Sequence, residues 1–262
     1  MKPQTGPKKI LILTASSGGG HLKAADALRI AFNTLGPRHA VTVIDVLDYA
    51  SKLFKKVYSN TYLDVSSKIP ELYKLLFRTT DSTALLSKYA KLRKFSIKLN
   101  LNKLVDYIDN FNPDMAFCVH FTPVEVLSNL KRDGKFKAPI LCAITDYETH
   151  AIWLDKAVDL YFVPNADSKE YLQVCGYPSR NIMVSGIPID PVYAERKDKN
   201  ETRKKLKLAQ NKTTLLVLGG ATLRDGRRDV RRRFSARQLL LAASDPEAVC
   251  RLVPVDRRQR GR

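Results

Sequence analysis

The sequence predicts an α/β fold, a doubly wound parallel sheet with helices on both faces. Short apolar runs typical of buried parallel strands alternate with segments that carry apolar residues at helical spacing. A glycine-rich turn joins the first such run to the first helical segment. Six runs are expected to form one sheet: 8–15, 41–46, 115–119, 140–144, 160–163 and 181–185.

The segments between these runs have local reasons to form helices. Residues 22–35 place small and large apolar side chains on one stripe, and Gly36-Pro37 ends it. Residues 47–110 lack strand alternation and are expected to be mostly helical. Further helices are expected at 123–130, 168–174 and 201–208.

The composition narrows the class of protein. The 262 residues are 44% hydrophobic and 27% charged, which excludes wholesale disorder. No apolar run approaches the roughly 18–20 residues of a membrane span, and residues 1–9 lack the apolar core of a secretory signal. The four cysteines show no metal-ligand spacing, so we expect reduced thiols in a cytoplasmic protein without a metal site.

The net charge of +19 is not evenly distributed. Residues 1–220 hold 33 basic and 21 acidic side chains, whereas residues 221–262 hold 12 arginines, no lysine and 5 acids. The tail is either a basic arm that binds polyanions or the product of a changed reading frame. The sequence favours the changed frame, because an apolar run into glycines at 213–220 begins a new α/β unit that the tail does not continue.

The region 52–103 has 12 basic against 3 acidic residues, interleaved with leucine, phenylalanine and tyrosine. Basic amphipathic helices of this kind bind membranes that carry anionic lipid. The alternatives are a solvated face over core helices, or nucleic-acid binding, for which no motif is present. We therefore expect anionic membrane lipids, and no nucleic acid, as partners of this region.

The glycine turn Gly18-Gly19-Gly20-His21 suits an anion or a developing oxyanion at a helix N-terminus. It is not a Walker A loop, and Lys23 replaces the third glycine of a dinucleotide fingerprint. A dinucleotide oxidoreductase is further weakened because no acidic residue is expected to end the second strand in the required register. His21 could accept a proton from a hydroxyl, or it could simply pack against the turn.

Chemically active side chains also follow the later strands. His120 follows one run, and Asp146, His150 and Trp153 follow the next. Ligands of open α/β sheets bind outside the carboxyl ends of strands, so these residues are candidates for a binding site. The structural alternative is that Asp146 caps a helix and Trp153 anchors the core.

Several motifs together resemble one family of enzymes. They are the segment 12–25 with its glycine turn, residues 69–74, His120-Phe121-Thr122-Pro123, Thr145-Asp146-Tyr147 with His150 and Trp153, and Gly186-Ile187-Pro188-Ile189. In this order they resemble the monogalactosyldiacylglycerol synthase and processive diacylglycerol glucosyltransferase family, over about residues 8–220. Relatives of that family include the peptidoglycan glycosyltransferase that forms lipid II.

The resemblance implies a glycosyltransferase of the GT-B fold, with two Rossmann-like domains facing a cleft and no metal or other cofactor. It implies that His21 is the catalytic base and that a hexose passes from a UDP-sugar, UDP-glucose or UDP-galactose, to diacylglycerol. Acceptor or lipid binding is assigned to Gly18, Gly19, Gly20, His120, Asp146, His150 and Trp153, and donor binding to Gly219 and Gly220.

The expected domain organisation follows from the same resemblance. An acceptor- and membrane-binding domain covers 1–187, a linker 188–212, the first strand of a largely missing donor domain 213–220, and the tail 221–262. The chain is therefore expected to be truncated, with little or no activity alone, and peripheral on the inner face of the cell membrane. Alternatives are a non-catalytic membrane-binding module, or a UDP-GlcNAc transferase acting on a polyprenyl-linked peptidoglycan precursor.

Overall fold

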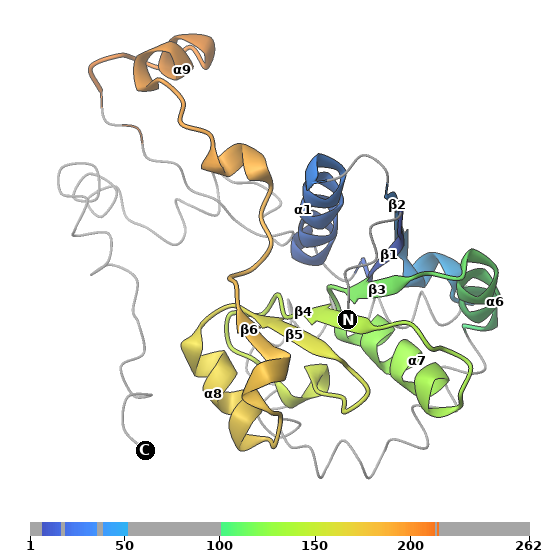
Figure 1. Cartoon of the computed structure of the whole chain (residues 1–262). Coiled ribbons are helices and arrows are strands. Elements are labelled where there is room, and N and C mark those ends of the chain that lie inside the picture. Colours follow the sequence, from blue (N-terminus) through green and yellow to red (C-terminus); the bar gives the residue numbers. More distant parts are fainter. Residues whose placement is uncertain (1–6, 17–18, 36–38, 52–100, 213, 215–262) are drawn as a thin grey trace. The chain divides into compact units, whose positions relative to one another are not determined.

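The computed structural model describes residues 7–16, 19–35, 39–51, 101–212 and 214 (Figure 1). The chain divides into two compact units, Met1–Ala194 and Glu195–Arg262. Most of the basic region 52–103, the run at 213–220 and the tail lie outside the described residues, so the expectations for them stay predictions.

The first unit is built on one parallel six-stranded sheet, with strand order β2-β1-β3-β4-β5-β6. All six predicted strands are confirmed, and each end lies within one residue of the expected position. The strands are β1 (Lys9–Thr14), β2 (Ala40–Asp45), β3 (Met115–Cys118), β4 (Ile140–Ala143), β5 (Leu160–Val163) and β6 (Ile182–Val184).

Helices lie on both faces of this sheet, as expected for a doubly wound fold (Figure 1). On one face, α1 (Gly19–Leu35) packs small side chains such as Ala24 against Ile10 and Ile12 of β1. The other face carries α6 (Asn102–Phe111), α7 (Phe121–Arg132) and α8 (Ala166–Val174), whose buried side chains belong to the same apolar cluster as Leu11 and Leu13. The inner strands β3 and β4 are apolar along their whole length because both of their faces are covered, whereas the edge strand β6 exposes Met183 and Val184.

Short 3₁₀ helices connect these elements: η1 (Val46–Tyr49), η2 (Ala151–Trp153), η3 (Ser179–Asn181) and η4 (Pro191–Ala194). Within the predicted helical stretch 47–110, the structure describes η1 and α6. Helix α6 ends at Phe111 and is capped by Asn112, which adopts the left-handed conformation with φ 46°.

The second unit is described at residues 195–212 and 214, where it contains α9 (Lys199–Lys205). Asp198 caps this helix by accepting a hydrogen bond of 2.8 Å from the amide of Glu201. The predicted basic helix is thus present, but it begins and ends two to three residues earlier than expected.

Candidate functional site

The strand order creates a switch point between β1 and β3. From β1 the chain enters α1 on one face of the sheet, whereas from β3 it enters α7 on the other face. The connections therefore diverge at the carboxyl ends of these strands, which is where ligands of open α/β sheets bind. His21 and His120 stand at these two ends.

Three of the predicted side chains meet at this point. The ring centroids of His21 and His120 are 4.5 Å apart, in an edge-on arrangement. The Trp153 ring lies 6.1 Å from His21 and 6.2 Å from His120. The sequence placed these residues at three separate strand ends, and the sheet brings them into one cluster.

His21, the third residue of α1, is held by two oxygens at the same ring nitrogen. Its Nδ1 lies 3.0 Å from the carbonyl oxygen of Val119 and 2.8 Å from Oγ1 of Thr145. Burial lowers the pKa of His21, while the Val119 carbonyl and the charge of Asp146 act in the opposite direction. The imidazole is therefore neutral at neutral pH, the form in which it can take up a proton.

His120 is buried and caps α7. Its Nδ1 accepts a hydrogen bond of 3.0 Å from the amide of Thr122, a donor of the first helical turn that an α-helix cannot pair with its own carbonyls. Burial, and secondarily the neighbouring His21, lower the pKa of His120 well below its ordinary value. Two neutral imidazoles thus lie side by side.

Asp146 and Trp153 form a direct pair. The indole Nε1 donates a hydrogen bond of 2.7 Å to Oδ2 of Asp146, and the indole is fully buried in the core. Trp153 is therefore a core anchor, as the structural alternative proposed. The cap of η2 is not Asp146 but His150, whose Nδ1 accepts from the amide of Ile152 at 3.0 Å.

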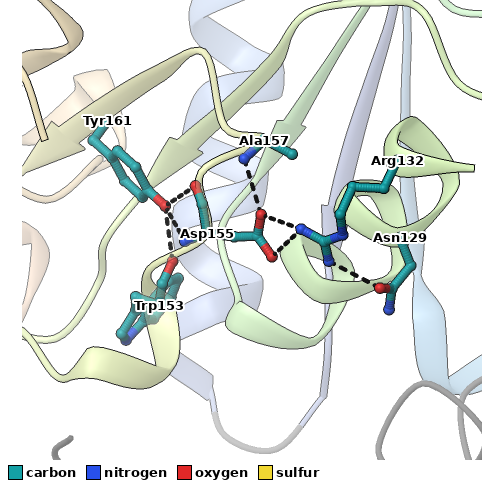
Figure 2. Close-up of polar contacts among 6 residues, drawn as sticks. All are labelled: Asn129, Arg132, Trp153, Asp155, Ala157 and Tyr161. Carbon is teal, nitrogen blue, oxygen red and sulfur yellow. Dashed lines mark hydrogen bonds and ion pairs between the residues drawn. The ribbon is translucent and has the colours of Figure 1, made fainter. Parts of the chain in front are cut away.

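The backbone behind Trp153 is held by a polar network (Figure 2). The hydroxyl of Tyr161 lies 3.1 Å from the carbonyl oxygens of Trp153 and Asp155, and it accepts from the amide of Asp155 at 2.8 Å. Nη1 of Arg132 donates to both carboxylate oxygens of Asp155, at 2.7 and 3.0 Å. This network fixes the turn that carries Trp153 into the cluster.

The glycine turn is described in part. Gly19 and Gly20 form the exposed first turn of α1, and a Cβ built at either would meet no heavy atom within 4 Å. Packing therefore gives no reason for glycine here, which is consistent with a ligand approaching the backbone. Gly18, Gly219 and Gly220 lie outside the described residues, and their assignments stay predictions.

Three contributions to the site were not expected from the sequence. Two are the Val119 carbonyl and the Thr145 hydroxyl at His21. The third is Asp45, which ends β2 although no acidic residue was expected there in register; its Oδ1 accepts from the amides of Ser16 (3.3 Å) and Leu47 (2.9 Å). Asp45 thus ties the segment that follows β1 to the neighbouring strand, and its position in the strand pattern could have revealed it.

Cys118, Cys142 and Cys175 are free thiols, and burial raises the pKa of the first two. No three His, Cys, Asp or Glu side chains in the described segments are grouped as metal ligands. None of the helices described is both long and apolar enough to span a bilayer.

The chain matches enzymes that attach sugars to diacylglycerol. The family model for monogalactosyldiacylglycerol (MGDG) synthase matches residues 21–189. The chain is 31% identical to a processive diacylglycerol beta-glucosyltransferase of Bacillus subtilis and 32% identical to that of Bacillus pumilus, each over 216 residues. These alignments cover 82% of this chain and 54% of each relative, so the chain spans about half the length of the relatives it matches.

Solved structures are more distant. The apo form of the lipopolysaccharide outer core galactosyltransferase WaaB is 14% identical, with a TM-score of 0.38 over 68% of this chain and 44% of its own. Anabaena HepE in complex with UDP-glucose is 13% identical, with a TM-score of 0.41 over 79% and 51%. The family assignment rests on the sequence matches, not on these structures: the chain belongs to the monogalactosyldiacylglycerol synthase family of glycosyltransferases.

Proposed function

We propose that this chain supplies the acceptor half of an enzyme that transfers a hexose from a UDP-sugar to diacylglycerol. One observation carries the proposal: His21 stands at the β1–β3 switch point with Nδ1 beside the Val119 carbonyl. A carbonyl oxygen only accepts, so this contact favours a proton on Nδ1 and leaves Nε2 to act as a base. Family membership and the names of the relatives supply the reaction class.

In the proposed step, Nε2 of His21 takes the proton of the acceptor hydroxyl. The hydroxyl oxygen forms a bond to the anomeric carbon of the sugar while the bond from that carbon to the UDP oxygen breaks. The electron pair of the broken bond leaves with UDP, and the configuration at the anomeric carbon inverts. General-base assistance of this kind contributes roughly 10²- to 10⁴-fold to a rate.

The other predicted residues receive supporting roles in this proposal. Gly19 and Gly20, with Gly18, would leave room for the acceptor at the start of α1, where amide groups are free to bind an oxygen. His120 and Trp153 shape the apolar side of His21, and Asp146 contributes negative charge. His150 acts more remotely by fixing η2.

The membrane would be approached through the basic region 52–103, which places the enzyme peripherally on the inner face of the cell membrane. In the GT-B arrangement that the family implies, the UDP-sugar occupies a second Rossmann-like domain, to which Gly219 and Gly220 would belong. The sequence predicts that the sugar is glucose or galactose. It also predicts little or no turnover by this chain alone.

The test is a transfer assay at high protein concentration with radiolabelled UDP-glucose, UDP-galactose and UDP-GlcNAc in parallel. Each donor is offered diacylglycerol vesicles or a polyprenyl-linked peptidoglycan precursor. Labelled glycosyl-diacylglycerol that disappears in His21→Gln supports the proposal. Product only on the polyprenyl acceptor favours the UDP-GlcNAc transferase instead.

A second measurement tests the non-catalytic alternative. Co-sedimentation with vesicles, with and without anionic lipid and diacylglycerol, reports binding in the absence of turnover. Binding that needs anionic lipid but is unchanged by diacylglycerol and by His21→Gln, together with no product from any donor, would favour a membrane-binding module.

A further inference from the structure

We propose that Thr145 is a positioning residue, whose hydroxyl joins the Val119 carbonyl in holding His21 as the Nδ1-protonated tautomer. This inference rests on the proposed function, because the tautomer matters to the reaction only if His21 is the base. Neither the motif pattern nor the family match assigns this role to Thr145.

The contact distances lead to this assignment. Nδ1 of His21 has two oxygens within hydrogen-bond distance, Val119 O at 3.0 Å and Thr145 Oγ1 at 2.8 Å. If Nδ1 carried only a lone pair, that lone pair would face the carbonyl oxygen without a proton between them. With a proton on Nδ1, both oxygens accept from it, and the Thr145 hydroxyl directs its own proton elsewhere.

The fold makes this arrangement rigid. Val119 directly follows β3, and its amide is held by the carbonyl of Leu13 at 3.0 Å. Thr145 follows the end of β4, where the amide of Ile144 donates to Phe162 at 2.9 Å. The two acceptors therefore come from neighbouring strands of one sheet, 98 and 124 residues away from His21 in the chain.

The same geometry serves the step in which His21 gains a proton. Once Nε2 is protonated, the positive charge is shared with Nδ1–H, which already points at two oxygens. Hydrogen bonds to a charged group are stronger than neutral ones, so the two acceptors stabilise the imidazolium. Among the residues that the structure describes, two further titratable groups face His21: His120, across an edge-on contact of 4.5 Å, and Asp146, whose charge favours the protonated ring.

The test reads the tautomer directly, without any turnover. Long-range ¹H–¹⁵N NMR of the full chain distinguishes a protonated from an unprotonated ring nitrogen, and His21→Gln identifies the signals of His21. We expect Nδ1 to be protonated and Nε2 unprotonated above neutral pH. In Thr145→Val we expect the pKa of His21 to fall by about 0.5–1, and in Thr145→Ser to return toward the wild-type value.

Thr34→Val is the matched control, because Thr34 is exposed on the same helix and its hydroxyl bonds to Ile30 at 2.9 Å. It should leave the signals of His21 unchanged. A wild-type His21 protonated on Nε2 would overturn the proposal, as would Thr145→Val with unaltered pKa and tautomer. If Thr145→Val does not fold, the wild-type tautomer and Thr145→Ser still decide.

The outcome is separable from that of the transfer assay. If His21 has the expected tautomer and responds to Thr145 but no sugar is transferred, the positioning role holds and the function is in doubt. If sugar is transferred and His21 is indifferent to Thr145→Val, the function holds and the inference fails.

Discussion

The indole of Trp153 donates its N–H to Asp146, seven residues earlier, across 2.7 Å. This single bond satisfies the polar atom of a fully buried aromatic ring and fixes a carboxylate near His21. The motif residues Asp146 and Trp153 therefore act as a pair, and the segment between them forms a closed turn.

Removing the acceptor of this bond should destabilise the fold. Asp146→Ala leaves the buried N–H of Trp153 without its partner, and we expect the free energy of unfolding to fall by about 1–3 kcal/mol. Asp146→Asn retains an acceptor oxygen, so its free energy of unfolding should fall by less. Urea unfolding measures both variants, with the exposed Glu148→Gln as a control expected within about 0.5 kcal/mol of wild type. Equal stability of Asp146→Ala and wild type would contradict the pairing.

Removing the hydroxyl of Tyr161 should lower the free energy of unfolding by a similar amount. Tyr161→Phe leaves the amide of Asp155 without its acceptor and takes a donor from the carbonyls of Trp153 and Asp155. We expect a loss of about 1–3 kcal/mol, measured by chemical unfolding. Tyr147→Phe is the control, because that side chain is 75% exposed. Equal stability of the two variants would contradict the prediction that the hydrogen bonds of Tyr161 in Figure 2 stabilise the fold.

The pKa shifts of the two histidines predict an acid-sensitive fold. In the unfolded chain both histidines take up protons as the pH falls through about 6.5. In the folded protein burial lowers the pKa of both, so they take up protons only at lower pH. The free energy of unfolding should therefore fall as the pH drops from about 7 to about 5. Denaturant unfolding across this range measures the slope.

One variant isolates the contribution of His120 to this pH dependence of stability. His120→Asn keeps a side-chain oxygen that can cap α7 but removes the titrating ring. We expect a smaller pH dependence of stability between about pH 7 and 5, whatever the cost of the smaller side chain at a single pH. An unchanged slope would show that His120 does not delay proton uptake.

Adding a methyl group to the glycine turn should leave the stability of the fold intact but weaken binding of the acceptor. Gly20→Ala meets open space and favours the helix, so the stability should stay constant or rise by up to about 1 kcal/mol. Gly134→Ala is the contrasting control, because its φ of +72° disfavours alanine and should lower stability. If Gly20 makes room for the acceptor, Gly20→Ala should also weaken diacylglycerol-dependent binding in vesicle co-sedimentation. Unimpaired binding would remove that role.

The strands were predictable because burial on both faces forces a local composition. A strand such as β1, with Leu11 and Leu13 facing one layer and Ile10 and Ile12 the other, must be apolar over this central stretch. The candidates at the strand ends were predictable for a related reason, since polar residues cluster where the strands end and ligands bind there.

The contacts of the site were not predictable in the same way. Every residue has a backbone carbonyl, so nothing in the side chain of Val119 reveals that its oxygen lies against His21. Likewise, Tyr161 has the composition of an ordinary core residue, and its hydroxyl matters only because the turn at Asp155 folds back onto it. Which of Asp146 and His150 caps η2 also depends on how that turn closes.

By itself, the sequence determined the strands, the helices that join them, the family and the side chains from which the site is made. The tertiary structure decided which of them meet. The order β2-β1-β3-β4 places the ends of β1, β3 and β4 side by side, and so brings His21, Val119 and Thr145 within hydrogen-bond distance across roughly half the chain. Hydrogen bonds act over about 3 Å, whereas sequence patterns report only local periodicity and burial, so only the folded sheet could set these contacts.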